Sequence, residues 1–194
     1  MTVSPNEALI RKRRRRSSPK IFTGDHVDVS NIPSFRKLMH KFGDSLVLFS
    51  SNCHKVNKRN KTQERIVVVT DQAVYNLIPR SYKCKRRIPL SDLTGVSLST
   101  LPDNFISLHC VDYDYLFMLS RKTEFVHVIL SNAVTLPSSF KVNLNDTFIY
   151  RADKTNLLRE VVFEPVETEN GNGVSTLIFT VAGVPNAEEG GDSE

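Results

Sequence analysis

A ladder of short apolar segments, separated by turn residues, limits what this chain can fold into. The segments expected to form strands are 45–56, 65–70, 73–78, 87–90 extending into 95–99, 105–111 and 115–119. Strands at this spacing with tight turns are typical of a small antiparallel barrel or sandwich. The hydrophobic content of 40% is sufficient for a real core.

Two amphipathic segments flank this ladder. Phe35, Leu38, Met39 and Phe42 repeat at i, i+3, i+4 and i+7, which predicts a helix that starts near Pro33 and stops at Gly43. The segment 122–133 places apolar residues on one face and predicts a second helix, with Thr123 as its cap. Its Val and Ile content leaves a strand as the alternative.

Strands closed by one amphipathic helix follow the order of a pleckstrin-homology domain. We therefore expect a mainly β fold: a pleckstrin-homology-like antiparallel barrel capped by the helix at 122–133. Segments 142–151, 158–163 and 175–181 predict three more strands, with a turn at 170–173, and so an extended domain. The predicted organisation is a disordered basic arm at 1–20, the domain at 21–184 and a disordered acidic tail at 185–194.

Two basic clusters interrupt the strand ladder. The first comprises Lys55, Lys58, Arg59, Lys61 and Arg65, and the second comprises Arg80, Lys83, Lys85, Arg86 and Arg87. Like charges crowded on adjacent turns repel one another and contribute nothing to the stability of the fold. The clusters therefore indicate an anionic partner.

The charge of the chain is divided between its two halves. Residues 1–100 carry 20 Lys and Arg against 7 Asp and Glu, and residues 101–194 carry 6 against 14. This asymmetry predicts that the N-terminal half meets a membrane surface or a nucleic acid. No apolar run has the length of a membrane span, and three cysteines without a pairing pattern indicate a reduced, intracellular protein.

The basic arm has two interpretations. Its residues Arg11, Lys12, Arg13, Arg14, Arg15 and Arg16 precede Ser17 and Ser18. They predict either a polybasic membrane tether, which phosphorylation of these serines would weaken, or a nuclear-import or nucleic-acid-binding patch.

The stretch 82–105, YKCKRRIPLSDLTGVSLSTLPDNF, resembles the core of the myosin I tail homology domain, the lipid-binding part of class I myosin tails. Shorter matches occur in the same order at 14–17, 22–25, 49–58, 65, 70–71, 114–116, 122–125, 159–161 and 163. The resemblance spans residues 13–182. It implies a pleckstrin-homology-like fold, anionic phospholipids as ligands and an association with the actin cytoskeleton.

The resemblance also implies which residues hold a headgroup. Lys55, at the end of the first strand, and Arg65, at the start of the second, take the two fixed positions, while Lys58, Arg59 and Lys61 add attraction from the loop. The alternative for this loop is a solvated turn without a ligand. The second cluster predicts a diffuse, positively charged surface that is attracted to an anionic membrane. The alternative is that Arg86 or Arg87 pairs with Asp92 or Asp103.

The sequence shows no motif of a catalytic or metal-binding site. Cys53-His54, Cys84 and His109-Cys110 lack the spacing of a zinc site, and adjacent strand residues face opposite ways. No glycine-rich turn accompanies a Cys–His pair, so we expect neither an enzyme, a cofactor nor a bound metal. No Gly-x-x-x-x-Gly-Lys-Ser/Thr pattern of a myosin motor is present. The chain is either part of a longer myosin or free-standing, and its initial Met favours the second.

The sequence thus predicts a non-enzymatic, monomeric membrane-binding module. Its predicted ligands are phosphoinositides and phosphatidylserine at the inner face of the plasma membrane or at endosomes, with actin-cytoskeleton proteins as further partners. A nucleic-acid-binding protein is the alternative, but the basic clusters contain only Tyr82 as a stacking aromatic. A protein-interaction scaffold that uses a strand edge is the third hypothesis.

Overall fold

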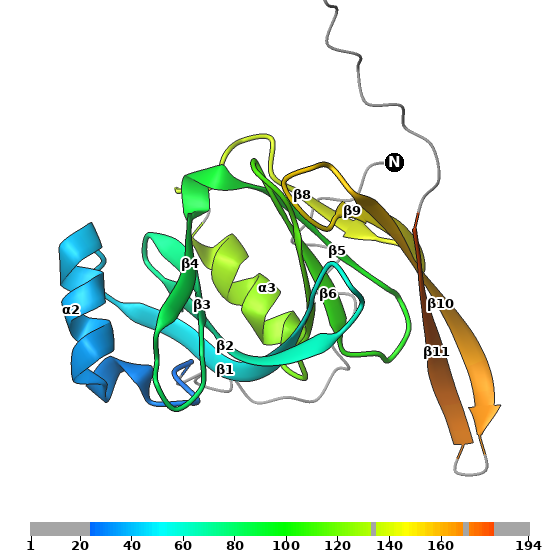
Figure 1. The fold of residues 1–194 in the computed structure, drawn as a ribbon, viewed down its shortest axis with the longest axis horizontal. Helices are drawn as coiled ribbons and strands as arrows, with labels where there is room; N and C mark the ends of the chain where they lie inside the picture. Colours follow the sequence, from blue (N-terminus) through cyan, green and yellow to red (C-terminus); the bar gives the residue numbers. More distant parts are fainter. Residues whose placement is uncertain (1–23, 133–134, 169–170, 181–194) are drawn as a thin grey trace, which may run out of the picture.

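The structure is a computed structural model of the chain that describes residues 24–132, 135–168 and 171–180. It is mainly β (Figure 1), with an eight-stranded sheet of order β4-β3-β2-β1-β7-β6-β5-β8 and a three-stranded sheet of order β11-β10-β9. The predicted basic arm at 1–20, with Arg11–Arg16, and the predicted tail at 185–194 lie outside the described residues.

Four antiparallel strands form the first half of the large sheet. They are β1 (Val47–Val56), β2 (Thr62–Thr70), β3 (Ala73–Leu77) and β4 (Cys84–Pro89). β2 begins three residues before the predicted strand at 65–70, which brings Arg65 into the ladder opposite Cys53. The basic residue is therefore held by strand pairing and not by a loop.

The second half contains β5 (Leu93–Leu98), β6 (Phe105–Cys110) and β7 (Tyr115–Met118). β7 pairs with β1 at Lys55↔Phe117, so the first and last of the seven strands are neighbours. The expectation that 87–90 extends into 95–99 was wrong. A 3-10 turn, η2 (Leu90–Asp92), separates β4 from β5, and buried Leu90 and Leu93 anchor this corner to the core.

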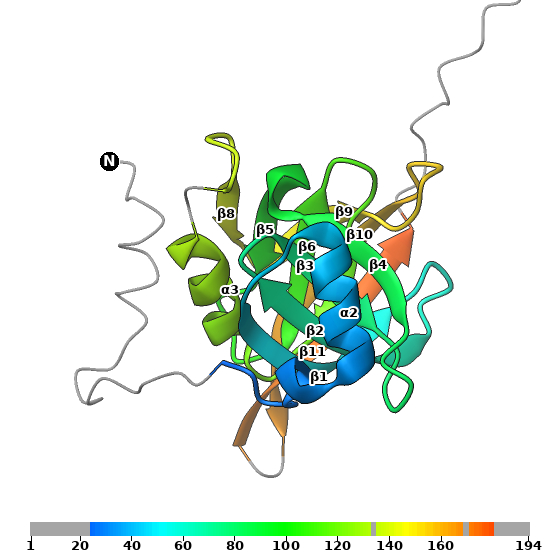
Figure 2. The same ribbon diagram turned by 90° about the vertical axis from the view of Figure 1, so that its left-hand side faces the viewer.

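β2 is buried on both faces, which explains its continuous apolar run. Val67 and Val69 face the main core, where α3 (Lys122–Ser131) packs, whereas Ile66 and Val68 face α2 (Pro33–Phe42). The short η1 (Val29–Asn31) leads into α2. Figure 2 shows α2 in front of β2 and β3, and Figure 1 shows α3 on the other side of these strands.

The ends of the two helices follow local chemistry. Pro33 opens α2, and Gly43 closes it at φ 76°, a conformation that glycine adopts without strain. The predicted apolar face is only partly buried, because Phe35 and Met39 are buried but Phe42 is 46% exposed. α3 confirms the helix alternative for 122–133, although its cap residue is Arg121 and not Thr123.

The C-terminal extension consists of β8 (Lys141–Leu144), β9 (Thr147–Arg151), β10 (Leu158–Thr168) and β11 (Gly171–Thr180). The prediction of one strand at 142–151 was wrong, since β8 and β9 belong to different sheets. β8 also pairs in parallel with β5, an exception to the predicted antiparallel arrangement. A Cβ on Gly95 would lie 2.5 Å from the Lys141 carbonyl oxygen, so this close approach requires glycine.

The extension packs on the barrel through a cluster of its own. Val56 and Leu116 from the barrel meet Phe148, Val161 and Phe163 from the extension. The prediction of a mainly β, pleckstrin-homology-like barrel with a capping helix and additional C-terminal strands is thus confirmed.

Candidate functional site

Lys55 lies near the end of β1, where its half-buried side chain contacts aromatic rings. Its ammonium nitrogen is 4.4 Å from the centroid of the Tyr115 ring and 5.8 Å from that of Tyr113. The two tyrosine hydroxyls are hydrogen-bonded to each other at 2.9 Å. The aromatic faces stabilise the cation at a place where water has limited access.

Arg65 projects from the neighbouring strand to the same side of the sheet. It stands opposite Cys53, a member of the main core cluster, and Lys55 follows Cys53 by two residues. Opposite residues in an antiparallel pair share a face, and side chains alternate along a strand. Lys55 and Arg65 therefore continue the inner face of the barrel beyond its apolar core.

Arg86 of β4 joins these two residues. It is two positions before Ile88, which faces the main core, so Arg86 points inward as well. Its guanidinium carbon lies 5.5 Å from the Tyr113 ring centroid, and it forms an ion pair with Asp112. We call Lys55, Arg65 and Arg86 the cationic site.

The electrostatics of the cationic site favour an added anion. The pKa of Lys55 falls from 10.5 to about 8, first because burial disfavours its charge and then because Arg65 and Arg86 repel it. Within the described part of the chain, the Nε–H groups of Arg65 and Arg86 have no hydrogen-bond acceptor. Asp112 offsets only one of the three positive charges. A phosphate group would relieve the remaining repulsion.

The loop residues predicted for the same site are oriented differently. Lys58 extends to Asp153 at 3.6 Å, and its carbonyl oxygen accepts a hydrogen bond from Arg159, so the β1–β2 loop contacts the extension. Arg59 and Lys61 are exposed, and their backbone N–H groups both donate to the Asn57 side chain. Lys58, Arg59 and Lys61 therefore lie on a hydrogen-bonded turn next to the cationic site in sequence, and they are not part of the inner face that carries Lys55 and Arg65.

The second basic cluster divides into three parts. Arg80 and Lys83 are exposed on the β3–β4 connection, Lys85 is exposed near the start of β4, and Arg86 belongs to the cationic site. Arg87 faces the opposite side, where it donates to Asp44 at 2.7 Å and to the Tyr75 hydroxyl at 2.9 Å. Both arginines thus have acidic partners, but these are Asp112 and Asp44 instead of the anticipated Asp92 or Asp103.

The residues considered for metal or thiol chemistry include two buried cysteines. Cys53 and Cys110 are buried, and burial raises the pKa of each thiol to about 12. In residues 24–132, 135–168 and 171–180, no group of three or more His, Cys, Asp and Glu side chains is placed to hold a metal ion.

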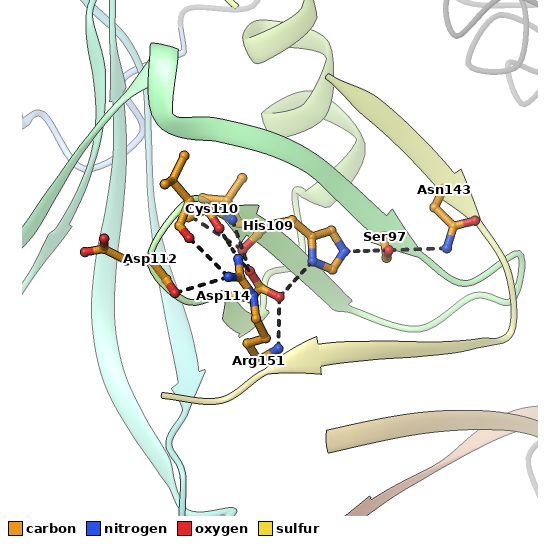
Figure 3. Close-up of polar contacts among 9 residues, drawn as sticks. Ser97, His109, Cys110, Asp112, Asp114, Asn143 and Arg151 are labelled. Carbon is orange, nitrogen blue, oxygen red and sulfur yellow. Dashed lines mark hydrogen bonds and ion pairs between the residues drawn. The ribbon is translucent and has the colours of Figure 1, made fainter. Parts of the chain in front are cut away.

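A serine–histidine–aspartate chain is the polar network that sequence reasoning missed (Figure 3). His109 Nε2 lies 2.7 Å from Ser97 Oγ, and His109 Nδ1 lies 3.0 Å from Asp114 Oδ2. The three residues come from β5, β6 and the following loop, and only the β5–β6 register reveals that they meet. A groove of about 520 Å³ between β5, β8 and β9 is lined in part by Ser97 and His109.

This network joins the barrel to the extension. Asp114 also accepts hydrogen bonds from the backbone N–H groups of Cys110 and Arg151 and from the Arg151 guanidinium. Ser97 is 2% exposed, and its strand is paired on both sides, which commits the neighbouring amides to the ladder. A serine in this setting lacks the free backbone donors that an acyl-transfer site requires.

Comparison with known proteins assigns the chain to a family. The profile described as "Unconventional myosin tail, actin- and lipid-binding" matches residues 13–184. The chain belongs to this family of myosin tails. The resemblance to class I myosin tails that the sequence indicated is therefore confirmed, and the match includes every residue of the cationic site.

Several myosin heavy chains are similar to this tail. Myosin IB heavy chain of Dictyostelium discoideum is 30% identical over 198 residues, covering 92% of this chain and 17% of the relative. Myosin heavy chain IB of Acanthamoeba castellanii is 35% identical over 111 residues, covering 54% and 10%. Human unconventional myosin-Ig is 39% identical over 90 residues, covering 46% and 9%. The chain thus spans less than a fifth of the length of these relatives.

Among solved structures, the N-terminal PH domain of human ARAP2 shares 18% identity with a TM-score of 0.38, covering 46% of this chain and 83% of that domain. The hSac2 domain of human phosphoinositide phosphatase Sac2 shares 9% identity with a TM-score of 0.41, covering 58% and 88%. Within the described ranges, no helix is both long and apolar enough to cross a membrane.

Proposed function

We propose that this myosin tail domain is a peripheral membrane-binding module that recognises anionic phospholipids, with phosphoinositides as preferred ligands. The observation that carries this proposal is the convergence of Lys55, Arg65 and Arg86 on one inner face, with a single carboxylate to offset them. The family description, actin- and lipid-binding, is consistent with this function. The module binds and does not catalyse.

The cations of the site have different roles toward a phosphate. Arg65 offers a planar guanidinium that can make two parallel hydrogen bonds to a phosphate when its Nη groups leave the Glu64 carbonyl and Gln63 amide oxygens to which they donate. Lys55 contributes a compact charge backed by Tyr115. A bound phosphate would raise the pKa of Lys55 again, and the attraction between the ammonium and the phosphate adds to the affinity.

Other basic residues strengthen the attraction without selecting a headgroup. Lys58, Arg59, Lys61, Arg80, Lys83 and Lys85 are exposed, and each contributes about 1 kcal/mol near an anionic leaflet. The arm at Arg11–Arg16, outside the described residues, adds a polybasic tether in this proposal. The module would then reside at the cytoplasmic face of the plasma membrane or of endosomes.

The test separates a defined site from a charged surface. Lys55→Ala and Arg65→Ala are compared with a triple variant, Arg80→Ala, Lys83→Ala and Lys85→Ala, by co-sedimentation with vesicles. The vesicles carry phosphatidylinositol 4,5-bisphosphate or phosphatidylserine at matched total charge. Each single variant should lose affinity for the bisphosphate vesicles about tenfold or more, since a charge-assisted contact contributes about 1.5–3 kcal/mol.

The triple variant should weaken binding to both kinds of vesicle and leave the preference between them intact, because diffuse attraction is screened within about 8 Å at physiological salt. Circular dichroism controls for folding. Equal behaviour of the two sets would refute a defined site. Loss of RNA binding in both sets without loss of vesicle binding would favour the nucleic-acid alternative.

A further inference from the structure

Asp112 lies at the edge of the cationic site and already pairs with one of its three cations. It lies on the loop between β6 and β7, and its carboxylate forms an ion pair with Arg86. The Arg86 hydrogen bond lowers the pKa of Asp112, so the carboxylate is ionised at neutral pH. In the free protein, Asp112 therefore holds the position at Arg86 that an anionic ligand would take.

The backbone of this loop is fixed from the side of the extension (Figure 3). Arg151 donates to the carbonyl oxygens of Cys110, Val111 and Asp112, and to the carboxylate of Asp114. Asp114 donates its own N–H to the Arg151 carbonyl oxygen at 2.9 Å. These contacts hold the main chain, whereas the Asp112 side chain remains 48% exposed and is free to change rotamer.

A second cation can receive the Asp112 carboxylate when it leaves Arg86. Lys154 Nζ lies 4.0 Å from Asp112 Oδ2, and its side chain is 69% exposed. Release of Arg86 therefore does not leave Asp112 without a partner. The exchange needs only side-chain rotation on the surface, which costs little.

We propose that Asp112 is a displaceable internal counter-ion that sets the charge an anionic headgroup needs to occupy the cationic site. This proposal rests on the proposed function of the site and adds a threshold for its occupancy. Asp112 carries one negative charge, and the phosphatidylserine headgroup also carries a net charge of about −1. Replacing Asp112 by this headgroup at Arg86 therefore brings no net electrostatic gain. A phosphomonoester carries about −1.5 to −2 and brings a net gain. Asp112 thus sets a threshold for occupancy, which a phosphomonoester exceeds and a singly charged anion does not.

The test removes the counter-ion without changing its size. Asp112→Asn should bind phosphatidylserine vesicles about two- to fivefold more tightly, the range for loss of an exposed ion pair. Its affinity for phosphatidylinositol 4,5-bisphosphate vesicles should rise by a similar factor, because both headgroups displace the same carboxylate from Arg86. Glu164→Gln is the matched control, because it removes one negative charge from an exposed residue of β10. The control should change neither affinity beyond its effect on net charge.

A double-mutant cycle shows whether the effect passes through Arg86. In an Arg86→Gln background, Asp112→Asn should have no effect on either vesicle, because the cation it neutralises is gone. Thermal unfolding checks that each variant folds, and Asp112→Ser is a second variant that also removes the charge. An increase no larger than that of Glu164→Gln, or an increase that persists without Arg86, overturns the proposal.

The result also separates this proposal from the one on which it depends. If Lys55→Ala reduces bisphosphate binding but Asp112→Asn raises the affinity for neither vesicle beyond the Glu164→Gln control, the cationic site stands and the counter-ion role is refuted. If Lys55→Ala and Arg65→Ala leave bisphosphate binding unchanged, the site itself is refuted, and the role of Asp112 falls with it.

Discussion

At the scale of single residues, Lys55 is the group whose chemistry depends most on its surroundings. Burial and the two nearby arginines oppose its positive charge, while the Tyr115 ring supports it. The balance places its pKa at about 8 in the free protein. A small change in local charge therefore changes its protonation at physiological pH.

Lipid binding should consequently depend on pH. A bound phosphate raises the pKa of Lys55 above its value of about 8 in the free protein, so binding above pH 8 takes up a proton and weakens as the pH rises. If only the ammonium form binds, affinity for bisphosphate vesicles falls about tenfold between pH 7 and pH 9. Lys55→Arg should remove this dependence, since guanidinium stays charged.

Co-sedimentation at pH 7, 8 and 9 measures the effect. Lys83→Arg is the control, because Lys83 is exposed and should leave the wild-type profile unchanged. The phosphate's own second ionisation has a pKa near 6, so further ionisation between pH 7 and pH 9 makes the phosphate only slightly more negative and cannot weaken its binding. A Lys55→Arg profile that matches the wild type would show that Lys55 does not titrate on binding.

The sequence could predict only part of this site. Resemblance to the family placed Lys55 and Arg65, and strand alternation explains why they share a face. The opposite orientations of Arg86 and Arg87 depend on the register of β4 against β3, which contains an irregularity at Asn76 and Leu77. Asp112 approaches Arg86 from 26 residues away through the barrel fold, which no local pattern indicates.

At the scale of elements, α2 is fixed to the barrel by a buried polar cluster as well as by apolar contacts. Asp44, directly after the helix, accepts hydrogen bonds from the hydroxyls of Thr70 and Tyr75 and pairs with Arg87. The side chain of Asp44 is fully buried. The Arg87 charge and the Tyr75 hydroxyl proton depend on that one carboxylate, whereas the Thr70 hydroxyl can also donate to the Ala73 carbonyl oxygen.

Asp44→Ala should therefore lower the free energy of unfolding by about 3 kcal/mol, because it leaves the Arg87 charge without its carboxylate and the Tyr75 hydroxyl without its acceptor. Urea unfolding followed by far-UV circular dichroism measures the loss. Asp92→Ala, at an exposed residue, should change stability by less than about 0.5 kcal/mol. A loss below about 1 kcal/mol for Asp44→Ala would mean that apolar packing alone holds α2.

Long periodic segments were predicted correctly, and breaks within apolar runs were not. The pattern of α2 and the strands β1 to β3 follow from burial of one or both faces. The break between β8 and β9 has a local cause that the hydrophobicity pattern does not show. Asn145 accepts a hydrogen bond from the Thr147 N–H, and Asp146 reaches across to Thr100, which turns the chain toward the second sheet.

At the scale of the whole molecule, charge and packing connect the two sheets. The cationic site lies on the large sheet, whereas Glu160, Glu164 and Glu167 lie on β10 of the small sheet. Figure 1 shows β10 and β11 projecting away from the large sheet as a long hairpin. These three glutamates of β10 therefore lie on a different sheet from the cationic site, and this difference in charge should favour one orientation on an anionic surface.

Whether the extension and the barrel fold together depends on their shared cluster. Phe163 of β10 is 3% exposed, and its ring centroid lies 5.7 Å from that of Phe105 in the barrel and 5.6 Å from that of Phe148 in β9. Val56 and Leu116, next to Lys55 and Tyr115, complete the cluster. The residues that support the cationic site are therefore packed directly on the extension.

Phe163→Ala should lower the free energy of unfolding by about 3–5 kcal/mol, because it removes a buried ring and leaves a cavity between the two sheets. The loss should occur within one cooperative transition, so hydrogen exchange should become faster in β1 as well as in β10. Leu177→Ala, at a 41% exposed position of the same small sheet, is the control and should have little effect. Faster exchange confined to β9, β10 and β11 would show instead that the barrel is stable without the extension. In that case the support of Lys55 and Asp112 would have to come from the barrel strands alone.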